Sequence, residues 1–163
     1  MTVAEIQTLI AGIETNFLEE QVWRLWSERA LLEVSSVPVW LVELYDAEKT
    51  DDALSALYRG WRETTENDVP LNQSQLYLGF LYLRYLSGKL TLQKLLLEAG
   101  GFSDRVNFDN PSCEAFYMLL NEYEGRESLP PYNSETFNER VESLFISFAE
   151  LAKKQLASLQ RAG

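Results

Sequence analysis

Apolar residues recur every three to four positions along most of this chain, which is the spacing that places them on one face of an α-helix. The longest such stripe lies within residues 134–160 and keeps a period of about 3.6 residues. Its members are Phe137, Val141, Leu144, Phe145, Phe148, Leu151, Ala152, Leu156 and Leu159. Because a single helix cannot bury its own apolar face, we expect a long C-terminal helix that packs along the rest of the chain.

Capping patterns predict where the first helices begin. Thr2 and Glu5 have the three-residue spacing of a capping box, which predicts a first helix over residues 3–13. Thr15 or Asn16 is expected to cap the second helix, because short polar side chains accept hydrogen bonds from the free N–H groups of a helix start. The chain therefore begins with two helices joined by a short turn.

Glycines predict where later helices end. Gly88 has the position of the residue that follows a helix C-terminus, and Thr91 is expected to open the next helix. The pair Gly100-Gly101 predicts the end of that short helix, followed by a loop over residues 102–110. These two helices would flank a tight turn near the middle of the chain.

Two apolar runs fit either a helix or a buried strand, since periodicity does not separate the two. Residues 76–86 are apolar on all sides, and their length and flanking caps favour a helix. Residues 37–45 are rich in β-branched and aromatic side chains, so helix and strand both remain open there. A strand would lack an obvious pairing partner, which favours a helix for this run also.

The patterns together predict an all-α fold, a single compact domain of about eight helices with a long C-terminal helix. A chain of 163 residues with 46% apolar side chains, including 4 Trp, 8 Tyr and 8 Phe, can bury a substantial core. The connector at residues 128–133 contains Pro130 and Pro131 and allows a subdivision of the domain at that point.

Composition narrows the function. The chain has no histidine, so Ser-His-Asp hydrolases and zinc sites built on histidine are excluded, and no metal or cofactor is expected. It carries 14 Lys+Arg against 25 Asp+Glu, a formal charge of -11. Such a charge repels nucleic acid and anionic membrane surfaces, whereas it attracts basic proteins. These properties favour a binding protein over an enzyme.

The predicted compartment is the cytoplasm. Cys113 is the only cysteine, so no internal disulfide can form, as is usual in a reducing compartment. The first positive charge is Arg24, and no basic-then-apolar signal pattern precedes it. The most apolar run, residues 76–86, is too short to span a bilayer. At the start of a helix, the Cys113 thiol is expected to be a small half-buried side chain rather than a reactive group.

Two acidic clusters are the candidate sites for a basic partner. The first cluster comprises Glu43, Asp46, Glu48, Asp51 and Asp52, with Lys49 as its one basic residue. The second cluster includes Asp104, Asp109, Glu122 and Glu124, together with Tyr123, which its acidic neighbours predict to be exposed. Solvated helix faces are the competing explanation, and carboxylates at a helix start explain part of the first cluster by themselves.

A resemblance adds a specific function. The segments "LYLGFLYLRYLSGKLTLQKLLLEAGGF" and "NPSCEAFYMLLNEYEG" resemble small acidic helical immunity proteins of bacterial toxin systems, of the contact-dependent-inhibition type. The resemblance covers about a third of the chain and implies stoichiometric inhibition of a cognate toxin, often a basic nuclease. Neutralisation by the acidic clusters is then the expected mechanism.

Two other functions remain open. A regulatory adaptor or chaperone-like module would expose a large apolar groove rather than acidic patches. A carboxylate-based metal enzyme would need several carboxylates that converge in one cleft. The oligomeric state is not predicted.

Overall fold

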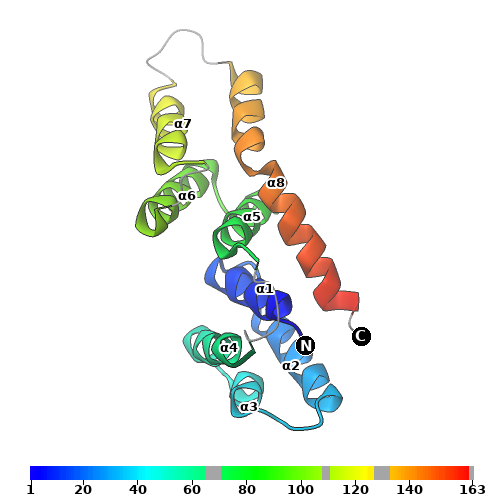
Figure 1. Cartoon of the computed structure of the whole chain (residues 1–163). Helices are drawn as coiled ribbons and strands as arrows, with labels where there is room; N and C mark the ends of the chain where they lie inside the picture. Colours follow the sequence, from blue (N-terminus) through cyan, green and yellow to red (C-terminus); the bar gives the residue numbers. More distant parts are fainter. Residues whose placement is uncertain (65–70, 108–110, 127–132, 162–163) are drawn as a thin grey trace.

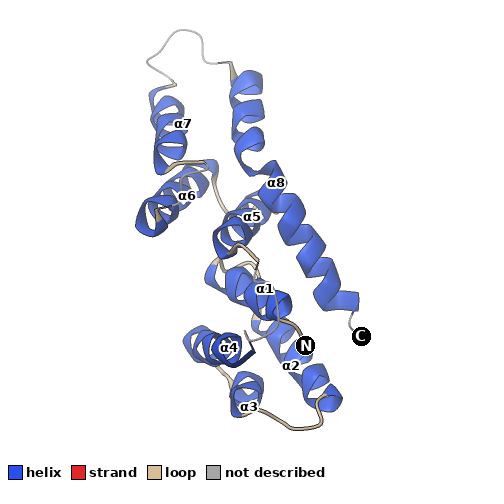
Figure 2. Cartoon of the chain, in the orientation of Figure 1, coloured by secondary structure: helices blue, strands red, loops and turns tan. Residues whose placement is uncertain are grey.

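The apolar stripes correspond to α-helices in a computed structural model that describes residues 1–64, 71–107, 111–126 and 133–161 (Figures 1 and 2). All regular secondary structure within these ranges is helical, as predicted. The eight helices are α1 (Val3–Glu14), α2 (Glu20–Glu33), α3 (Val39–Asp46), α4 (Thr50–Thr64), α5 (Gln73–Leu86), α6 (Leu92–Val106), α7 (Cys113–Gly125) and α8 (Ser134–Arg161).

Two hydrophobic clusters form the core. One cluster joins α1 to α2, α3 and α4, and the other joins α5, α6 and α7 to α8. The two clusters share Phe17 and Leu156, and α1 packs on both α5 and α4. In Figure 1 the helices form a stack from α3 at one end to α7 at the other, and α8 runs along the side of this stack.

The long C-terminal helix is confirmed, and its apolar stripe faces the stack. Phe137, Val141, Phe145, Phe148, Ala152 and Leu159 are buried. Leu144, Leu151 and Leu156 are half-buried and pack against the same core. The 3.6-residue period therefore predicted which side of α8 meets the rest of the chain.

The helix α5 lies very close to α8 because α5 carries a glycine at the contact. A Cβ atom at Gly79 would lie 2.2 Å from the backbone oxygen of Phe148. Only a residue without a side chain permits the two backbones to approach so closely. Gly79 therefore sets the spacing between the two helices that join the halves of the core.

The prediction that Gly100-Gly101 ends a helix is wrong. The helix α6 continues through both glycines to Val106, so most of the expected loop at residues 102–110 is helical. A Cβ at Gly100 would lie 2.7 Å from the ring of Tyr117, which shows that this glycine makes room for α7. The helix ends instead at Asn107, whose φ of 50° is in the left-handed region that often terminates helices.

The prediction that Thr15 or Asn16 caps the second helix is also wrong. Asn16 has a φ of 53°, and the backbone N–H groups of Phe17 and Leu18 donate to the carbonyl of Gly12. The chain reverses through this turn, and α2 begins only after Glu19, which makes no side-chain capping bond.

Other local predictions are confirmed. Thr2 and Glu5 form both bonds of the capping box. The Thr91 hydroxyl accepts from the backbone of Lys94, and Gly88 has a φ of 74° just after the end of α5. The run at residues 37–45 is helical from Val39 onward, in α3, and its buried side chains have helical spacing.

The proline-rich connector lies outside the described residues, except that Asn133 caps α8. The Asn133 side-chain oxygen accepts from the backbone N–H groups of Glu135 and Thr136. Within the described ranges, no helix is both long enough and apolar enough to cross a membrane.

Candidate partner-binding surface

The outer side of α3 exposes apolar residues. Trp40, Leu41 and Leu44 face the core, so the opposite side of this short helix is turned to solvent. That side carries Val39 and Val42, which are 67% and 41% exposed. Because residues three apart lie on one face of a helix, these two valines form a contiguous apolar strip.

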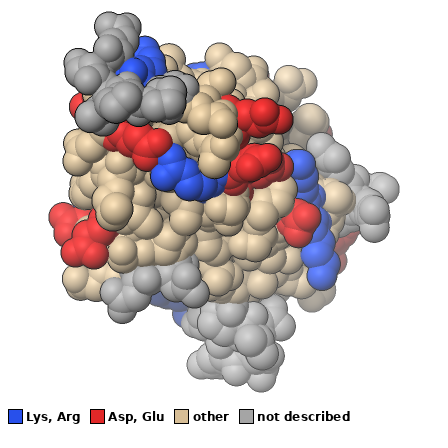
Figure 3. All heavy atoms as spheres, turned by 90° about the horizontal axis from the view of Figure 1, so that it is seen from above, with Lys and Arg blue, Asp and Glu red and all other residues tan. Residues whose placement is uncertain are grey.

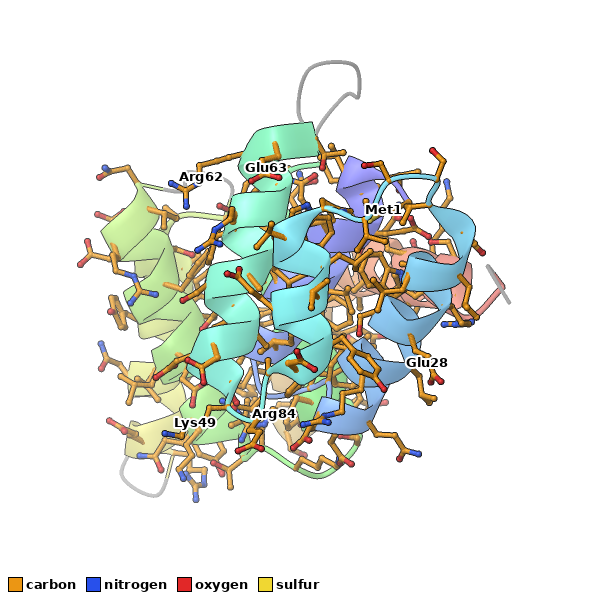
Figure 4. All side chains as sticks on the ribbon, turned by 90° about the horizontal axis from the view of Figure 1, so that it is seen from below. Met1, Glu28, Lys49, Arg62, Glu63 and Arg84 are labelled. Carbon is orange, nitrogen blue, oxygen red and sulfur yellow. The ribbon has the colours of Figure 1, made fainter. Side chains whose placement is uncertain are left out.

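Further exposed apolar side chains extend this strip. Tyr45, one turn beyond Val42, is 40% exposed, and Val37 is exposed two residues before the start of α3. Figure 4, seen from below, shows α3 and α4 side by side at the front of the molecule. We call the outer face of α3, the residues that lead into it and the start of α4 the α3–α4 surface.

Most of the first acidic cluster lies on this surface. Asp46 ends α3, Glu48 lies in the link to α4, and Asp51 and Asp52 occupy the first turn of α4, where they suit the positive end of the helix dipole. All four carboxylates are exposed. Lys49 is the basic residue among them, so the local charge is strongly negative.

The first cluster also contains a carboxylate with a structural partner. The Glu43 side chain pairs with the Arg59 guanidinium at 2.7 Å, which ties α3 to α4. Close by, Arg24 donates to the carbonyl of Ala47 at the end of α3 and pairs with Glu20. Glu43 therefore contributes to helix packing, and its charge is largely offset.

Two carboxylates of the second acidic cluster bond to neighbouring helices. Glu122 on α7 forms an ion pair with Arg140 on α8. The Glu124 carboxylate accepts a hydrogen bond of 2.7 Å from the Gln93 side chain on α6. Both carboxylates thus join α7 to its neighbours.

Figure 3 views the end of the molecule where α7 and the start of α8 lie. The acidic side chains on that face fall into separate groups with Lys and Arg between them.

The other residues predicted at the second cluster are Asp104, Asp109 and Tyr123. The Cys113 thiol, which is half-buried as expected, lies 3.9 Å from the Asp104 carboxylate. Asp109 lies outside the described residues. The prediction that Tyr123 is exposed is wrong, because its ring lies 6.1 Å from that of Phe137 and beneath the Arg126 guanidinium.

A cleft of about 840 Å³ opens beside the α3–α4 surface. It lies between α1, α4, α5 and α6, and the start of α4 forms part of its rim through Thr50 and Asp51. The volume is within the range of ordinary ligand sites, roughly 300–1,000 Å³. Its charged and aromatic lining residues are Glu14, Asp51, Tyr58, Tyr77, Phe102 and Arg105.

Two tyrosines on the walls of this cleft are held in the neutral form. Burial, the 2.5 Å hydrogen bond to Glu14 and the charge of that carboxylate raise the pKa of Tyr58 well above its ordinary value. Tyr77 stacks on Phe102 with ring centroids 3.9 Å apart. Burial, with the nearby charge of Glu98, raises the pKa of Tyr77 also.

We therefore expect alkaline conditions to destabilise the protein. The folded protein holds the protons of Tyr58 and Tyr77 more tightly than the unfolded chain, in which a tyrosine has a pKa of about 10. The stability that these two tyrosines contribute is therefore complete below pH about 10 and is lost as the pH rises above that value. The urea midpoint should be flat from pH 8 to 9.5 and should then decline toward pH 11.5. Tyr58→Phe should make this decline shallower, and an identical decline in both proteins would contradict the assignment.

An apolar pocket of about 350 Å³ lies on another part of the molecule, between α2 and the end of α8. Its lining is formed by Phe17, Leu18, Val22, Leu25, Trp26, Arg29, Leu156 and Leu159. Leu25 is half exposed at this pocket, and Arg29 bonds the carbonyl of Leu159. This pocket can hold an apolar side chain of a bound peptide.

The described parts of the chain contain no group of three or more His, Cys, Asp or Glu side chains placed to hold a metal ion. The cleft contains two carboxylates, Glu14 and Asp51, on different helices.

The apolar strip on α3 and the cleft were both missed by the sequence analysis. A signal for the strip exists: Val39 and Val42 lie three apart and are out of phase with Trp40, Leu41 and Leu44. The cleft has no such signal, because its walls come from four helices that are distant in the sequence.

The chain matches no family model, no curated protein and no solved structure.

Proposed function

We propose that this protein binds and blocks a basic protein partner through the α3–α4 surface. The observation that carries the proposal is the combination of an exposed apolar strip, Val39, Val42 and Tyr45, with four exposed carboxylates beside it. Exposed apolar patches rimmed by polar groups are typical of protein interfaces. The second acidic cluster is less suited to this role, because Glu122 and Glu124 already bond within the molecule.

The two kinds of side chain have different tasks in such a complex. Complementary charge accelerates association, by about ten- to a thousandfold at low salt. Buried apolar and aromatic anchors slow dissociation and thereby set most of the affinity. The α3–α4 surface supplies both, with the carboxylates at its edge and Tyr45 next to them.

The partner class that fits best is a toxin, and the protein is then an immunity protein that binds it in a stoichiometric complex without turnover. A nuclease presents Lys and Arg side chains to phosphate groups, and a surface of carboxylates can occupy the same positions. The resemblance of the segments from Leu76 to Phe102 and from Asn110 to Gly125 to acidic immunity proteins, together with the charge of -11, supports this identification. The cytoplasm is the compartment that suits a chain with one cysteine.

The apolar pocket between α2 and α8 supports a second candidate function. An adaptor or chaperone-like module would hold an apolar peptide side chain there, against Leu25 and Trp26. This function predicts binding that persists in high salt, since hydrophobic contacts are not screened. The two candidates are therefore separable in one experiment.

The experiment is capture of the partner from the native host with tagged protein, followed by measurement of stoichiometry and affinity. We expect a basic toxin domain at a one-to-one ratio. The double variant Val39→Ser/Val42→Ser should raise the dissociation constant about tenfold, or about 1.4 kcal/mol. The matched control is Leu97→Ser/Met118→Ser, whose side chains are 53% and 72% exposed on α6 and α7.

The control should change the dissociation constant less than about twofold, since surface substitutions outside an interface have small effects. Equal losses in both double variants, or a loss in the control alone, would exclude the α3–α4 surface as the interface. Capture of a neutral partner that binds equally well in high salt would instead support the adaptor.

A further inference from the structure

The cleft between α1, α4, α5 and α6 has the chemistry of a site for a cationic group. Glu14 on α1 and Asp51 on α4 contribute carboxylates to its lining. Tyr58 donates one hydrogen bond to Glu14 Oε1, so the glutamate keeps capacity to accept more, and the tyrosine also orients it. Two carboxylates on adjacent walls can accept the several N–H groups of a guanidinium.

Aromatic rings in the cleft also favour a bound cation. Tyr58 and Tyr77 line it, and Tyr77 is backed by Phe102 in a stacked pair. A guanidinium that lies against such a ring gains a cation–π attraction in addition to its hydrogen bonds. Arginine is better suited than lysine here, because its planar group can stack and bond at the same time.

The cleft also contains a positive charge, which limits the kinds of ligand that can bind there. Arg105, near the end of α6, lies 5.8 Å from the centroid of the Phe102 ring and also lines the cleft. A free polyamine carries several positive charges, and those near Arg105 would be repelled. A peptide segment with one basic side chain avoids this repulsion, because its backbone carbonyls can accept from Arg105 while the basic side chain meets Glu14 and Asp51.

We propose that this cleft receives an arginine side chain carried by a protruding segment of the protein partner. This inference rests on the proposed function and extends it, because Asp51 belongs both to the α3–α4 surface and to the rim of the cleft. The volume of about 840 Å³ accommodates a short peptide segment as well as the side chain. The cleft would thus anchor one arginine, while the apolar strip on α3 covers the surface around it.

A titration with small peptides tests the cleft without the partner. The probes are Ac-Gly-Arg-Gly-NH2 and the citrulline peptide Ac-Gly-Cit-Gly-NH2, which has nearly the same shape but no charge. Two-dimensional NMR of the ¹⁵N-labelled full chain reports binding at each amide. We expect the arginine peptide to shift the amide signals of the lining residues Asn16, Thr50 and Ser74, and the citrulline peptide to shift them at least about fivefold less at equal concentration.

Matched variants separate the cleft from the general negative charge. Glu14→Gln/Asp51→Asn should weaken the arginine peptide at least about fivefold, and the glutamine can still accept from Tyr58. Glu28→Gln/Glu139→Gln removes the same charge from exposed positions on α2 and α8, outside the cleft lining, and should change the affinity less than about twofold.

Equal binding of the two peptides, shifts confined to residues outside the cleft, or equal losses in the two double variants would each overturn the proposal. The titration uses no partner protein, so these results would overturn the cleft assignment alone. Failure of the capture experiment, with selective binding of the arginine peptide retained, would overturn the proposed function and the assignment of the arginine to that partner, but not the cleft as an arginine site.

Discussion

Phe145→Ala is expected to lower the free energy of unfolding by about 3–5 kcal/mol, the usual cost of removing a buried ring from a core. The Phe145 side chain is fully buried at the middle of α8. Its ring stacks on Tyr82 of α5 at 5.0 Å and lies 5.3 Å from Phe116 of α7. Its removal would leave a cavity where three helices meet. Urea unfolding followed by circular dichroism measures the change.

The neighbouring residue provides the control for this variant. Ile146 is on the same helix and is 38% exposed, so Ile146→Ala should cost about 1 kcal/mol or less. An unchanged urea midpoint for Phe145→Ala would refute the packing of α8 against α5 and α7. An equally large loss for Ile146→Ala would show that the assigned buried face of α8 is incorrect.

Gly79→Ala is expected to destabilise the protein by about 2 kcal/mol or more, although alanine is the better helix former. The new Cβ would overlap the Phe148 backbone oxygen, and a backbone atom cannot rotate away, so α5 and α8 must separate. Overpacking of this kind costs about 3 kcal/mol, and the gain in helix propensity returns about 1 kcal/mol. Urea unfolding again measures the outcome.

Gly101→Ala is the matched control, since Gly101 is also inside a helix. The nearest atom to its new Cβ is the Tyr117 hydroxyl at 3.8 Å, an ordinary contact distance. This variant should be neutral or more stable by about 0.5–1 kcal/mol. If both substitutions stabilise the protein, the close approach of α5 and α8 is incorrect.

The helices were largely predictable because their signals are local. The capping box of Thr2 and Glu5 and the apolar period of α8 depend on residues within one or two turns of each other, and both are confirmed. Gly100-Gly101 was misinterpreted for the opposite reason. The requirement for a small residue at Gly100 comes from Tyr117 on another helix, and a local reading takes the same glycine for a helix end.

The candidate surface was predictable only in part. The sequence places the acidic residues in two clusters, but it does not show that Glu43 meets Arg59 or that Glu122 meets Arg140, each many positions away. These ion pairs engage part of both clusters and leave Asp46, Glu48, Asp51 and Asp52 exposed beside an apolar strip. Tertiary pairing of charges therefore decides which carboxylates can meet a partner.

The position of the α3–α4 surface also separates binding from stability. The helix α3 packs on α2 and α4 at one end of the stack, whereas α8 joins the two halves of the core along its side (Figure 1). Exposed positions such as Val39 and Val42 can therefore be changed without opening the core that Phe145 and Gly79 maintain. Binding variants and stability variants should give independent effects.

The most direct test of the central claim is the salt dependence of the association rate constant for the captured partner. We expect the rate constant of the wild-type protein to fall at least about tenfold between 20 and 300 mM NaCl. The triple variant Asp46→Asn/Glu48→Gln/Asp52→Asn should associate slowly at low salt and show a much flatter dependence. Glu28→Gln/Glu139→Gln/Glu150→Gln, which removes the same charge from exposed positions on α2 and α8, should behave almost as wild type. Wild-type association that does not change with salt, or equal effects of the two triple variants, would contradict a partner that is attracted by the carboxylates of the α3–α4 surface.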